Sequence, residues 1–207
     1  MKTFMTAFGL IFLAELGDKT QLAAITMASE TGKPWHVFLG AALAFTVLTF
    51  VAVFLGAGLA LIMLAIAVID LRSFLIPDGL NAVAGVLAIL HAAAQEPATI
   101  LQAAAIAVLR GTVLALIFLA LRYGYARWRG RQGLGLGDVK LAFVAGAWLD
   151  WLTIPIVIQL AAFATLSAYL VRYLVSGQSL SATSRMPFGL FFAPAIWICW
   201  LLEVKWL

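Results

Sequence analysis

The sequence predicts an all-α, polytopic helical membrane protein, and three observations favour this class. Of the 207 residues, 65% are hydrophobic and 11% are charged, whereas a globular domain is about half apolar and a quarter charged. The apolar runs are continuous and rich in Ala and Leu, which favours helices over the alternating strands of a barrel. A mass of 22.2 kDa excludes large extramembrane domains. The single cysteine, Cys199, excludes an intrachain disulfide framework or a multi-cysteine zinc site.

Spans of about 20 residues are needed to cross a membrane, and the charged positions divide the chain into seven apolar segments. These are Thr3–Ala28, Val37–Ile69, Gly79–Ala94, Ile100–Leu121, Val139–Leu149, Ile154–Val175 and Phe188–Leu202. The second segment has 33 residues without a charge, about 50 Å of helix. It forms either one long tilted helix or two pieces broken at Gly56-Ala57-Gly58. We therefore predict six to seven transmembrane helices.

The basic residues set the expected orientation, because cytoplasmic loops carry the excess of Lys and Arg. The segment Arg122–Arg131 holds four arginines, so we expect a cytoplasmic loop there and place His91–Thr99 outside, with the N-terminus inside. We expect five tryptophans to form an outer interfacial belt. They are Trp148, Trp151, Trp197, Trp200 and Trp206. Arg110 falls within a span, where Asp150 or Glu15 is a candidate partner.

Two aspartates lie at the expected cytoplasmic edge of the spans. Asp70 closes the long apolar segment, and Asp138 follows the glycine-rich stretch Gly133–Gly137. Two carboxylates held about 3 Å apart do not both ionise, so one acts as acid and the other as base on a shared water. The simpler alternatives are a helix cap for Asp138 and an interfacial ion pair with Arg72 for Asp70.

Three motifs in order resemble the type IV prepilin peptidase family, the GxGD membrane aspartic proteases. They are Asp70-x-Arg72-x-x-x-x-Ile76-Pro77-Asp78, Gly135-x-Gly137-Asp138-Val139-Lys140 and Pro187-Phe188-Gly189-x-Phe191-x-Ala193-Pro194-Ala195. The resemblance covers about residues 60–207. It implies that Asp70 and Asp138 are the catalytic aspartates, with Asp78 as the rival for the first position and otherwise a supporting residue beside Pro77.

The resemblance also implies supporting roles around the two aspartates. We expect Gly135, Gly137 and Lys140 to shape and orient the second aspartate, and Pro187, Phe188 and Gly189 to line the substrate path. Bifunctional members of the family also methylate the new pilin N-terminus and carry paired cysteines. This sequence has one cysteine, so methyl transfer is not expected.

A third charged group, Glu15-Leu16-Gly17-Asp18-Lys19-Thr20, lies in the first apolar segment. Glu15, Asp18 and Lys19 share one helix face, and the plain interpretation is an internally neutralised salt pair. The motif also resembles one repeat of a family of small membrane cation/proton exchangers for manganese and calcium, over about residues 4–60. Such exchangers combine two inverted repeats. One helix supplies too few oxygen ligands to enclose a cation.

The sequence thus predicts two parts, an exchanger-like segment over residues 1–60 and a prepilin-peptidase-like core over residues 61–207. We expect a membrane aspartic endopeptidase in a bacterial or archaeal cytoplasmic membrane, cleaving the leader of type IV prepilins or related pseudopilins at the cytoplasmic face. Its expected partners are the pilin substrate and the lipid bilayer, with no nucleic acid, metal or cofactor. The alternatives are a divalent cation/proton exchanger using Glu15 and Asp18, and an inactive scaffold.

Overall fold

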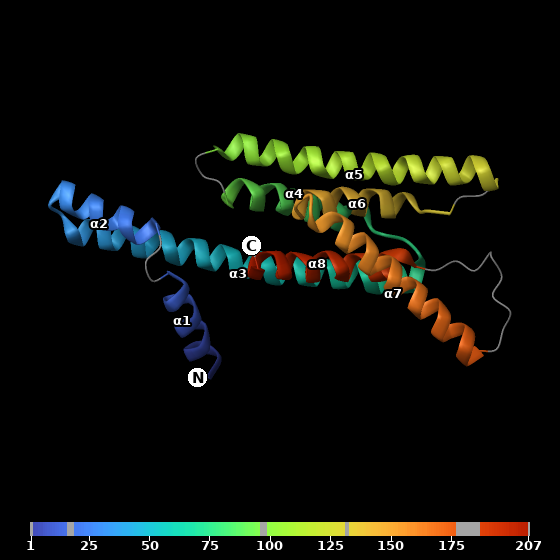
Figure 1. The fold of residues 1–207 in the computed structure, drawn as a ribbon, viewed down its shortest axis with the longest axis horizontal. Helices are drawn as coiled ribbons and strands as arrows, with labels where there is room; N and C mark the ends of the chain where they lie inside the picture. Colours follow the sequence, from blue (N-terminus) through green and yellow to red (C-terminus); the bar gives the residue numbers. More distant parts are fainter. Residues whose placement is uncertain (1, 16–18, 96–98, 131–132, 177–186, 207) are drawn as a thin grey trace. The chain divides into compact units, whose positions relative to one another are not determined.

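The computed structural model describes residues 2–15, 19–95, 99–130, 133–176 and 187–206, and throughout these ranges its regular elements are helices. The predicted all-α class is therefore confirmed (Figure 1). The helices run in chain order as follows: α1 Lys2–Glu15, α2 Lys19–Thr31, α3 Pro34–Ser73, α4 Asp78–Gln95, α5 Ile100–Arg129, α6 Leu136–Trp148, α7 Thr153–Ser176 and α8 Phe188–Trp206.

Within the described residues, three helical stretches are long and apolar enough to cross a membrane. They are Gly56–Ser73, Ile100–Arg129 and Thr153–Val175, and the shorter apolar stretches Pro34–Val47 and Phe188–Glu203 accompany them. The chain is thus a multi-pass membrane protein, while the number of crossings stays a prediction. Helix α3 runs unbroken for 40 residues, about 60 Å, so the expected alternative of a break at Gly56-Ala57-Gly58 is wrong.

Residues 1–54 form the first of two compact units. It holds α1, α2 and the first part of α3, and none of the side chains described in it is buried. Large apolar side chains such as Phe8 and Leu43 are 59% and 68% exposed. Gly32, at a φ of +62°, ends α2 in the left-handed conformation that glycine adopts without strain. This unit presents apolar surface and has no core of its own among the described residues.

Residues 55–207 form the second unit and contain the packed core. Helix α6 is its centre, packing against α4, α5 and α8, while α7 packs on α8. A Cβ at Gly146 would lie 2.6 Å from the carbonyl oxygen of Arg110, and one at Gly111 would lie 2.7 Å from that of Phe143. The glycines therefore let the backbones of α5 and α6 approach closely, as small residues do at membrane helix interfaces.

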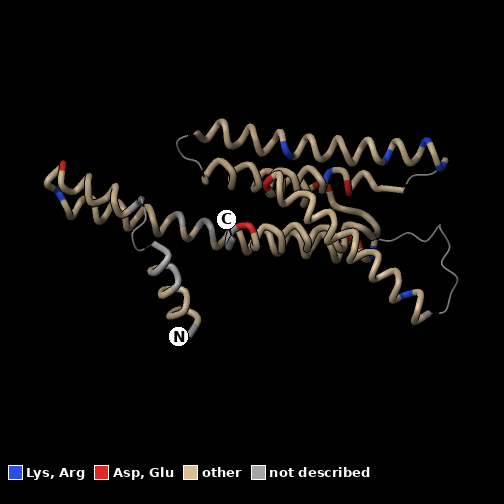
Figure 2. Tube along the Cα trace, in the orientation of Figure 1, with Lys and Arg blue, Asp and Glu red and all other residues tan. Residues whose placement is uncertain are grey.

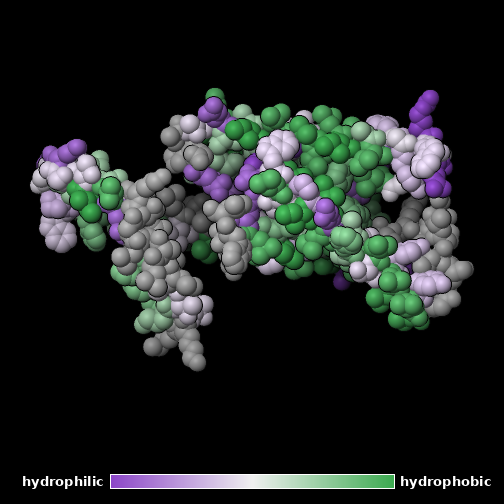
Figure 3. Space-filling model, viewed as in Figure 1, coloured by the Kyte–Doolittle hydropathy of each residue, from purple (hydrophilic) through white to green (hydrophobic). Residues whose placement is uncertain are grey.

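Helix α8 lies antiparallel to the second part of α3 (Figure 1). Near one end, Trp200 contacts the α-carbon face of Gly56. Near the other end, the Leu190 amide contacts Asp70. Hydrophobic side chains cover much of the visible face of this unit (Figure 3), as expected for a surface in contact with lipid.

Three sequence predictions need correction. Most of the predicted loop Arg122–Arg131 is helical, because α5 continues to Arg129 and ends at Gly130 with a φ of 67°. Basic residues lie at the C-terminal end of α5 (Figure 2). A helix can continue past its apolar part there because long arginine side chains keep their charges in water. His91 lies inside α4 rather than in a loop. Trp148 and Trp200 are 5% and 7% exposed, so these two pack in the core instead of forming a belt.

Candidate active site

Asp70 is buried near the C-terminal end of α3, with 5% of its surface exposed. Its Oδ2 atom accepts a hydrogen bond of 2.9 Å from the backbone N–H of Leu190, which lies in the first turn of α8. The first amides of a helix have no partner within the helix, and the helix dipole favours negative charge there. The site therefore holds this carboxylate by a helix N-terminus, and the expected ion pair with Arg72 is not seen among the described contacts.

Asp138 lies in the first turn of α6 and is also held by a backbone amide at a helix start. Its Oδ2 atom accepts a hydrogen bond of 3.0 Å from the backbone N–H of Gly135, the N-cap residue of that helix. The capping interpretation is thus correct in part, because the carboxylate does satisfy an amide at the helix start. Both aspartates are consequently fixed by backbone amides at the N-terminus of a helix, and neither depends on a flexible side chain for its position.

Ile76 is the side chain that links the two aspartate positions. A Cβ at Gly137, next to Asp138, would lie 2.9 Å from the Ile76 Cβ, and a Cβ at Gly189 would lie 2.7 Å from the Ile76 Cδ1. The Cβ at Gly189 would also lie 2.8 Å from Oδ2 of Asp70. Both glycines are therefore needed for close approach, and the structure brings Asp70, Ile76 and the start of α6 together in one place.

The electrostatics of Asp138 indicate that the two carboxylates interact. Asp138 lies in the first turn of α6, ahead of the apolar stretch from residue 139. The pKa of its carboxyl is raised to about 6, chiefly because burial disfavours the charged form. The hydrogen bond from Gly135 opposes this rise in the pKa, the charge of Asp70 adds to it, and Arg122 opposes it. A carboxyl with this pKa keeps a proton more readily than an exposed one, which is the condition for one member of a pair to act as an acid.

Arg122 is a site residue that the sequence analysis used only for topology. From α5, its guanidinium donates a hydrogen bond to the carbonyl of Leu134, the residue before the N-cap Gly135. Its charge also acts on Asp138. Arg122 therefore anchors the glycine-rich stretch whose next amide holds the Asp138 carboxylate. In the sequence, Arg122 lies shortly before the GxGD motif. That spacing does not by itself predict a contact.

Asp78 and Lys140 form a separate surface pair. The Lys140 Nζ lies 2.6 Å from Oδ1 of Asp78, and the Asp78 side chain is 75% exposed. Asp78 starts α4 after Pro77, so the loop of the first motif is tied to α6 by this ion pair. Such an exposed location does not favour Asp78 as the rival for the first catalytic position. Lys140 contacts Asp78 here, and its role in orienting Asp138 stays a prediction.

The third motif contributes the start of α8. Gly189 is buried against Asp70 and Ile76, while Phe188 packs with Phe192 at 5.1 Å and with Phe118 at 6.4 Å between ring centroids. Pro187 precedes the helix and is half-buried. The glycine thus lets the Leu190 amide reach Asp70, and the aromatic contacts fix the helix that carries this amide. A role of these residues in a substrate path stays a prediction.

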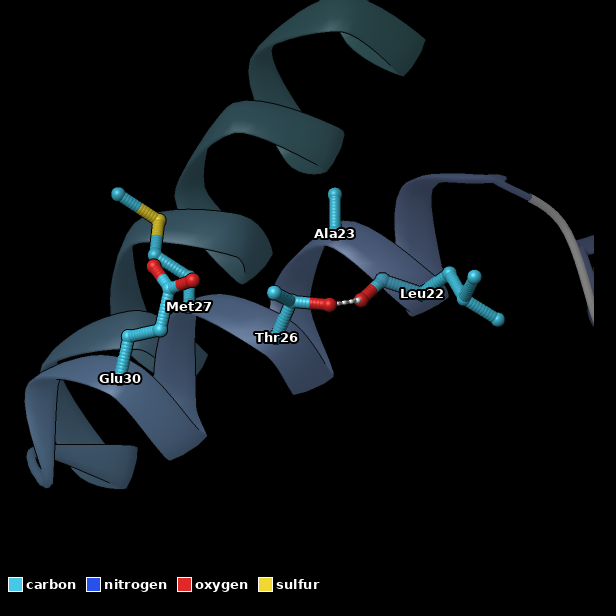
Figure 4. A pocket seen from close by; sticks show the side chains of 5 residues that line it. All are labelled: Leu22, Ala23, Thr26, Met27 and Glu30. Carbon is cyan, nitrogen blue, oxygen red and sulfur yellow. Dashed lines mark hydrogen bonds between the residues drawn. The ribbon is translucent and has the colours of Figure 1, made fainter.

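The N-terminal cation motif falls largely outside the residues that the structure describes. Asp18 lies outside them, and of Glu15 only its place at the end of α1 is given. An open hollow of about 500 Å³ lies on α2, lined by Leu22, Ala23, Thr26, Met27 and Glu30 (Figure 4). Its residues come from a single helix, and the Thr26 hydroxyl already donates to the Leu22 carbonyl. This hollow has no converging polar groups and is not a candidate site.

Two family comparisons match the chain. The model of the type IV leader peptidase family matches residues 57–170, which is more than half of the chain and includes Asp70, Ile76 and Asp138. The chain belongs to the type IV leader peptidase family. The model described as divalent cation/proton antiporter GDT1 matches residues 3–109. The two matches overlap, and in the overlap Leu59, Met63 and Ile66 are buried in the core of residues 55–207.

Curated relatives agree with the peptidase family. The chain is 38% identical over 78 residues to the leader peptidase HopD of Escherichia coli and 37% identical over 78 residues to that of Salmonella typhimurium. Each alignment covers 38% of this chain and 50% of the relative. A prepilin leader peptidase/N-methyltransferase of Aeromonas hydrophila is 33% identical over 86 residues, covering 42% of this chain and 29% of the relative. The chain thus spans half or less of these relatives. No solved structure matches.

Proposed function

We propose that the protein is a membrane aspartic endopeptidase that cleaves the leader of type IV prepilins or related pseudopilins at the cytoplasmic face. The observation that carries the proposal is the pair of aspartates, each held by a helix N-terminal amide and both packed around Ile76. Membership of the type IV leader peptidase family supports the substrate class.

The arrangement suits hydrolysis without a covalent intermediate. One carboxyl of the pair keeps its proton and polarises the scissile carbonyl, while the ionised one removes a proton from water as the water attacks the carbonyl carbon. The tetrahedral intermediate then collapses, and the leaving amine takes a proton from the dyad. The raised pKa of Asp138 supports its part in this exchange.

The supporting residues take positioning roles in this proposal. Arg122 anchors the Leu134 carbonyl and so holds the Gly135 amide against Asp138. Gly137 and Gly189 provide the space in which Ile76 sits between the two aspartates. Lys140 and Asp78 tie the first motif to α6 at the surface. We place the C-terminal end of α5, with Arg122, Arg127 and Arg129, on the cytoplasmic side, because cytoplasmic segments of membrane proteins carry the excess of positive charge.

Cleavage of a co-expressed prepilin tests the proposal, read as a shift in the mobility of the pilin on a gel. We expect cleavage by the wild type and its loss in Asp70→Asn and in Asp138→Asn. Asp78→Asn, at the rival position, loses only the surface ion pair with Lys140, so we expect it to retain most of the cleavage, whereas a catalytic Asp78 would lose it. Full cleavage by both Asp70→Asn and Asp138→Asn would overturn the proposal.

Cation/proton exchange is the second candidate, and the match of residues 3–109 to the GDT1 model favours it. It would use Glu15 and Asp18 as oxygen ligands for Mn²⁺ or Ca²⁺. This candidate predicts cation-dependent proton flux in proteoliposomes that Glu15→Gln abolishes and Asp138→Asn leaves unchanged. The two candidates are therefore separated by which pair of acids each activity requires.

A further inference from the structure

A second polar site lies within residues 55–207, away from the two aspartates. It is a cavity of about 270 Å³ whose lining includes His91, Arg110, Trp148, Asp150, Trp200 and Glu203. These residues come from α4, α5, the end of α6, the connection that follows it and the last turns of α8. Along α6, residues 138 and 148 are about 15 Å apart, so the cavity is not part of the candidate active site.

Charged groups of both signs line this cavity. Arg110, which is 8% exposed in the middle of α5, forms an ion pair with Asp150 through Nη1 and Oδ1, which decides between the two partners that the sequence offered. The backbone N–H of Asp150 donates to Oε1 of Glu203 at 2.9 Å. The carboxyl groups of Asp150 and Glu203 are close enough to interact with each other. The cavity thus contains one guanidinium, which pairs with Asp150, and two carboxyl groups that interact with each other.

The aromatic rings of the cavity, His91, Trp148 and Trp200, add no charge to it. The Trp200 Nε1–H donates to Nε2 of His91 at 3.3 Å, so this hydrogen-bond network assigns the ring proton to Nδ1 and the imidazole is neutral. The His91 ring stacks on Trp148 with 5.0 Å between centroids, and the Trp148 indole N–H donates to the Ala84 carbonyl at 3.0 Å. When Asp150 and Glu203 are both ionised beside Arg110, the site carries one negative charge in excess, which is the state that a bound cation would stabilise.

Two buried polar atoms of the cavity form no hydrogen bond within the part of the chain that the structure describes. They are Oε2 of Glu203, an acceptor, and Nε of Arg110, a donor. A buried polar atom without a partner costs free energy comparable to a lost hydrogen bond, and more when the group is charged. A ligand that satisfies both atoms would donate a hydrogen bond to Glu203 and accept one from Arg110.

We propose that this cavity binds a primary ammonium group, carried by an aminophospholipid headgroup or by a free small amine. The ammonium donates to Glu203 Oε2 and balances the excess negative charge beside the indole rings, which also attract cations. An oxygen of the same ligand accepts from Arg110 Nε. Among the described residues, no group of three or more His, Cys, Asp or Glu side chains gathers closely enough to hold a metal ion, so the donor set favours an amine.

The first test uses the wild-type protein in phosphatidylcholine nanodiscs, titrated with free ethanolamine or with choline. We expect ethanolamine to raise the thermal unfolding midpoint, whereas choline has no N–H to donate to Glu203 and leaves the midpoint unchanged. Replacing phosphatidylcholine by phosphatidylethanolamine distinguishes the sources. Stabilisation by both this lipid and ethanolamine supports a site open to any primary amine, and stabilisation by the lipid alone supports a headgroup site.

The second test assigns the effect to the cavity. Glu203→Gln keeps the shape of the side chain but removes the charge, and we expect at least a tenfold loss in apparent affinity for the stabilising amine or lipid. Glu30→Gln, a matched change at an exposed carboxylate on α2, retains wild-type affinity. Equal effects of ethanolamine, choline and NaCl on the wild type would overturn the proposal without any variant. Unchanged affinity in a folded Glu203→Gln protein would overturn it as well.

Discussion

Residues 1–54 and residues 55–207 both contain apolar helices but differ in what those helices bury. In the first unit no described side chain is buried, and a methyl group added at Gly9 or Gly40 would have nothing within 4 Å. In the second unit Gly111, Gly146 and Gly189 stand against backbone or carboxylate atoms of a neighbouring element. Apolar surface is thus common to both units, whereas among the described residues close packing fixes functional groups in the second unit.

The difference explains why two family signatures in one chain need not give two working sites. The peptidase signature lies in a unit whose helices meet through glycines and hold both aspartates by backbone amides. The signature of the antiporter family begins in a unit that lacks a core among its described residues. An exchanger of this kind would draw its remaining ligands from another element or another copy of the chain, since one helix does not complete a cation shell.

Among the contacts that position the two aspartates, the largest effect is expected at Gly189. A methyl group there would lie 2.8 Å from Oδ2 of Asp70 and 2.7 Å from the Ile76 side chain, so Gly189→Ala displaces the first aspartate. We expect at least a hundredfold loss in the rate of prepilin cleavage. Gly40→Ala in the first unit is the control and leaves the rate unchanged. Wild-type cleavage by Gly189→Ala would show that this contact does not position Asp70.

Arg122 is expected to give the next largest effect. Arg122→Ala removes the hydrogen bond to Leu134 and the positive charge near Asp138, and we expect about a tenfold lower kcat with little change in KM. Because the charge lowers the pKa of Asp138, the same variant shifts the pH profile of cleavage to higher pH. Arg122→Lys restores the charge and should return the pH profile toward the wild type. A lower rate with an unshifted pH profile would contradict the electrostatic part of this role.

Glycine substitutions away from the site test the packing contrast by stability alone. At Gly146 a methyl group would lie 2.6 Å from the Arg110 carbonyl oxygen, so Gly146→Ala should destabilise the folded protein by about 1–3 kcal/mol. At Gly40 the space is open, and alanine in a helix interior stabilises by roughly 0.5–1 kcal/mol relative to glycine. Thermal unfolding in detergent measures both. Equal shifts of the two variants would remove the distinction between the units.

The smallest effect concerns pH. The pKa of Asp138 is about 6 in the folded protein, above its ordinary value of 3.8, so between these values the folded state holds more protons than the unfolded state. Stability from this group is then lost as the pH rises from about 4 to about 6. In Asp138→Asn, the unfolding midpoint should fall by a few degrees less than in the wild type over this pH range. Asp70→Asn should move it to lower pH, because the charge of Asp70 raises the pKa of Asp138, and an unmoved transition would argue against their proximity.

The sequence predicted the helical class and the pairing of Asp70 with Asp138 because both follow from short patterns, apolar runs and a motif. It did not predict Ile76 as the side chain between them or Arg122 as the anchor of the GxGD stretch, since both contacts join residues from different helices. Charge counting placed Arg122–Arg131 in a loop, although arginine is a good helix former. The sequence predicted surface positions for His91 and Trp148 because both lie near the end of an expected span. Their burial depends on each other and on further helices, which the sequence pattern does not show.

One measurement tests the central claim most directly, that the chemistry resides in the packed unit and requires its two aspartates. It is the rate at which the purified protein cleaves a synthetic prepilin peptide in detergent, compared for Asp70→Asn, Asp138→Asn and the double variant Glu15→Gln with Asp18→Asn. We predict that each of the first two loses at least a thousandfold in rate, while the double variant matches the wild type. Retained cleavage in either aspartate variant, or its loss in the double variant, would contradict the account.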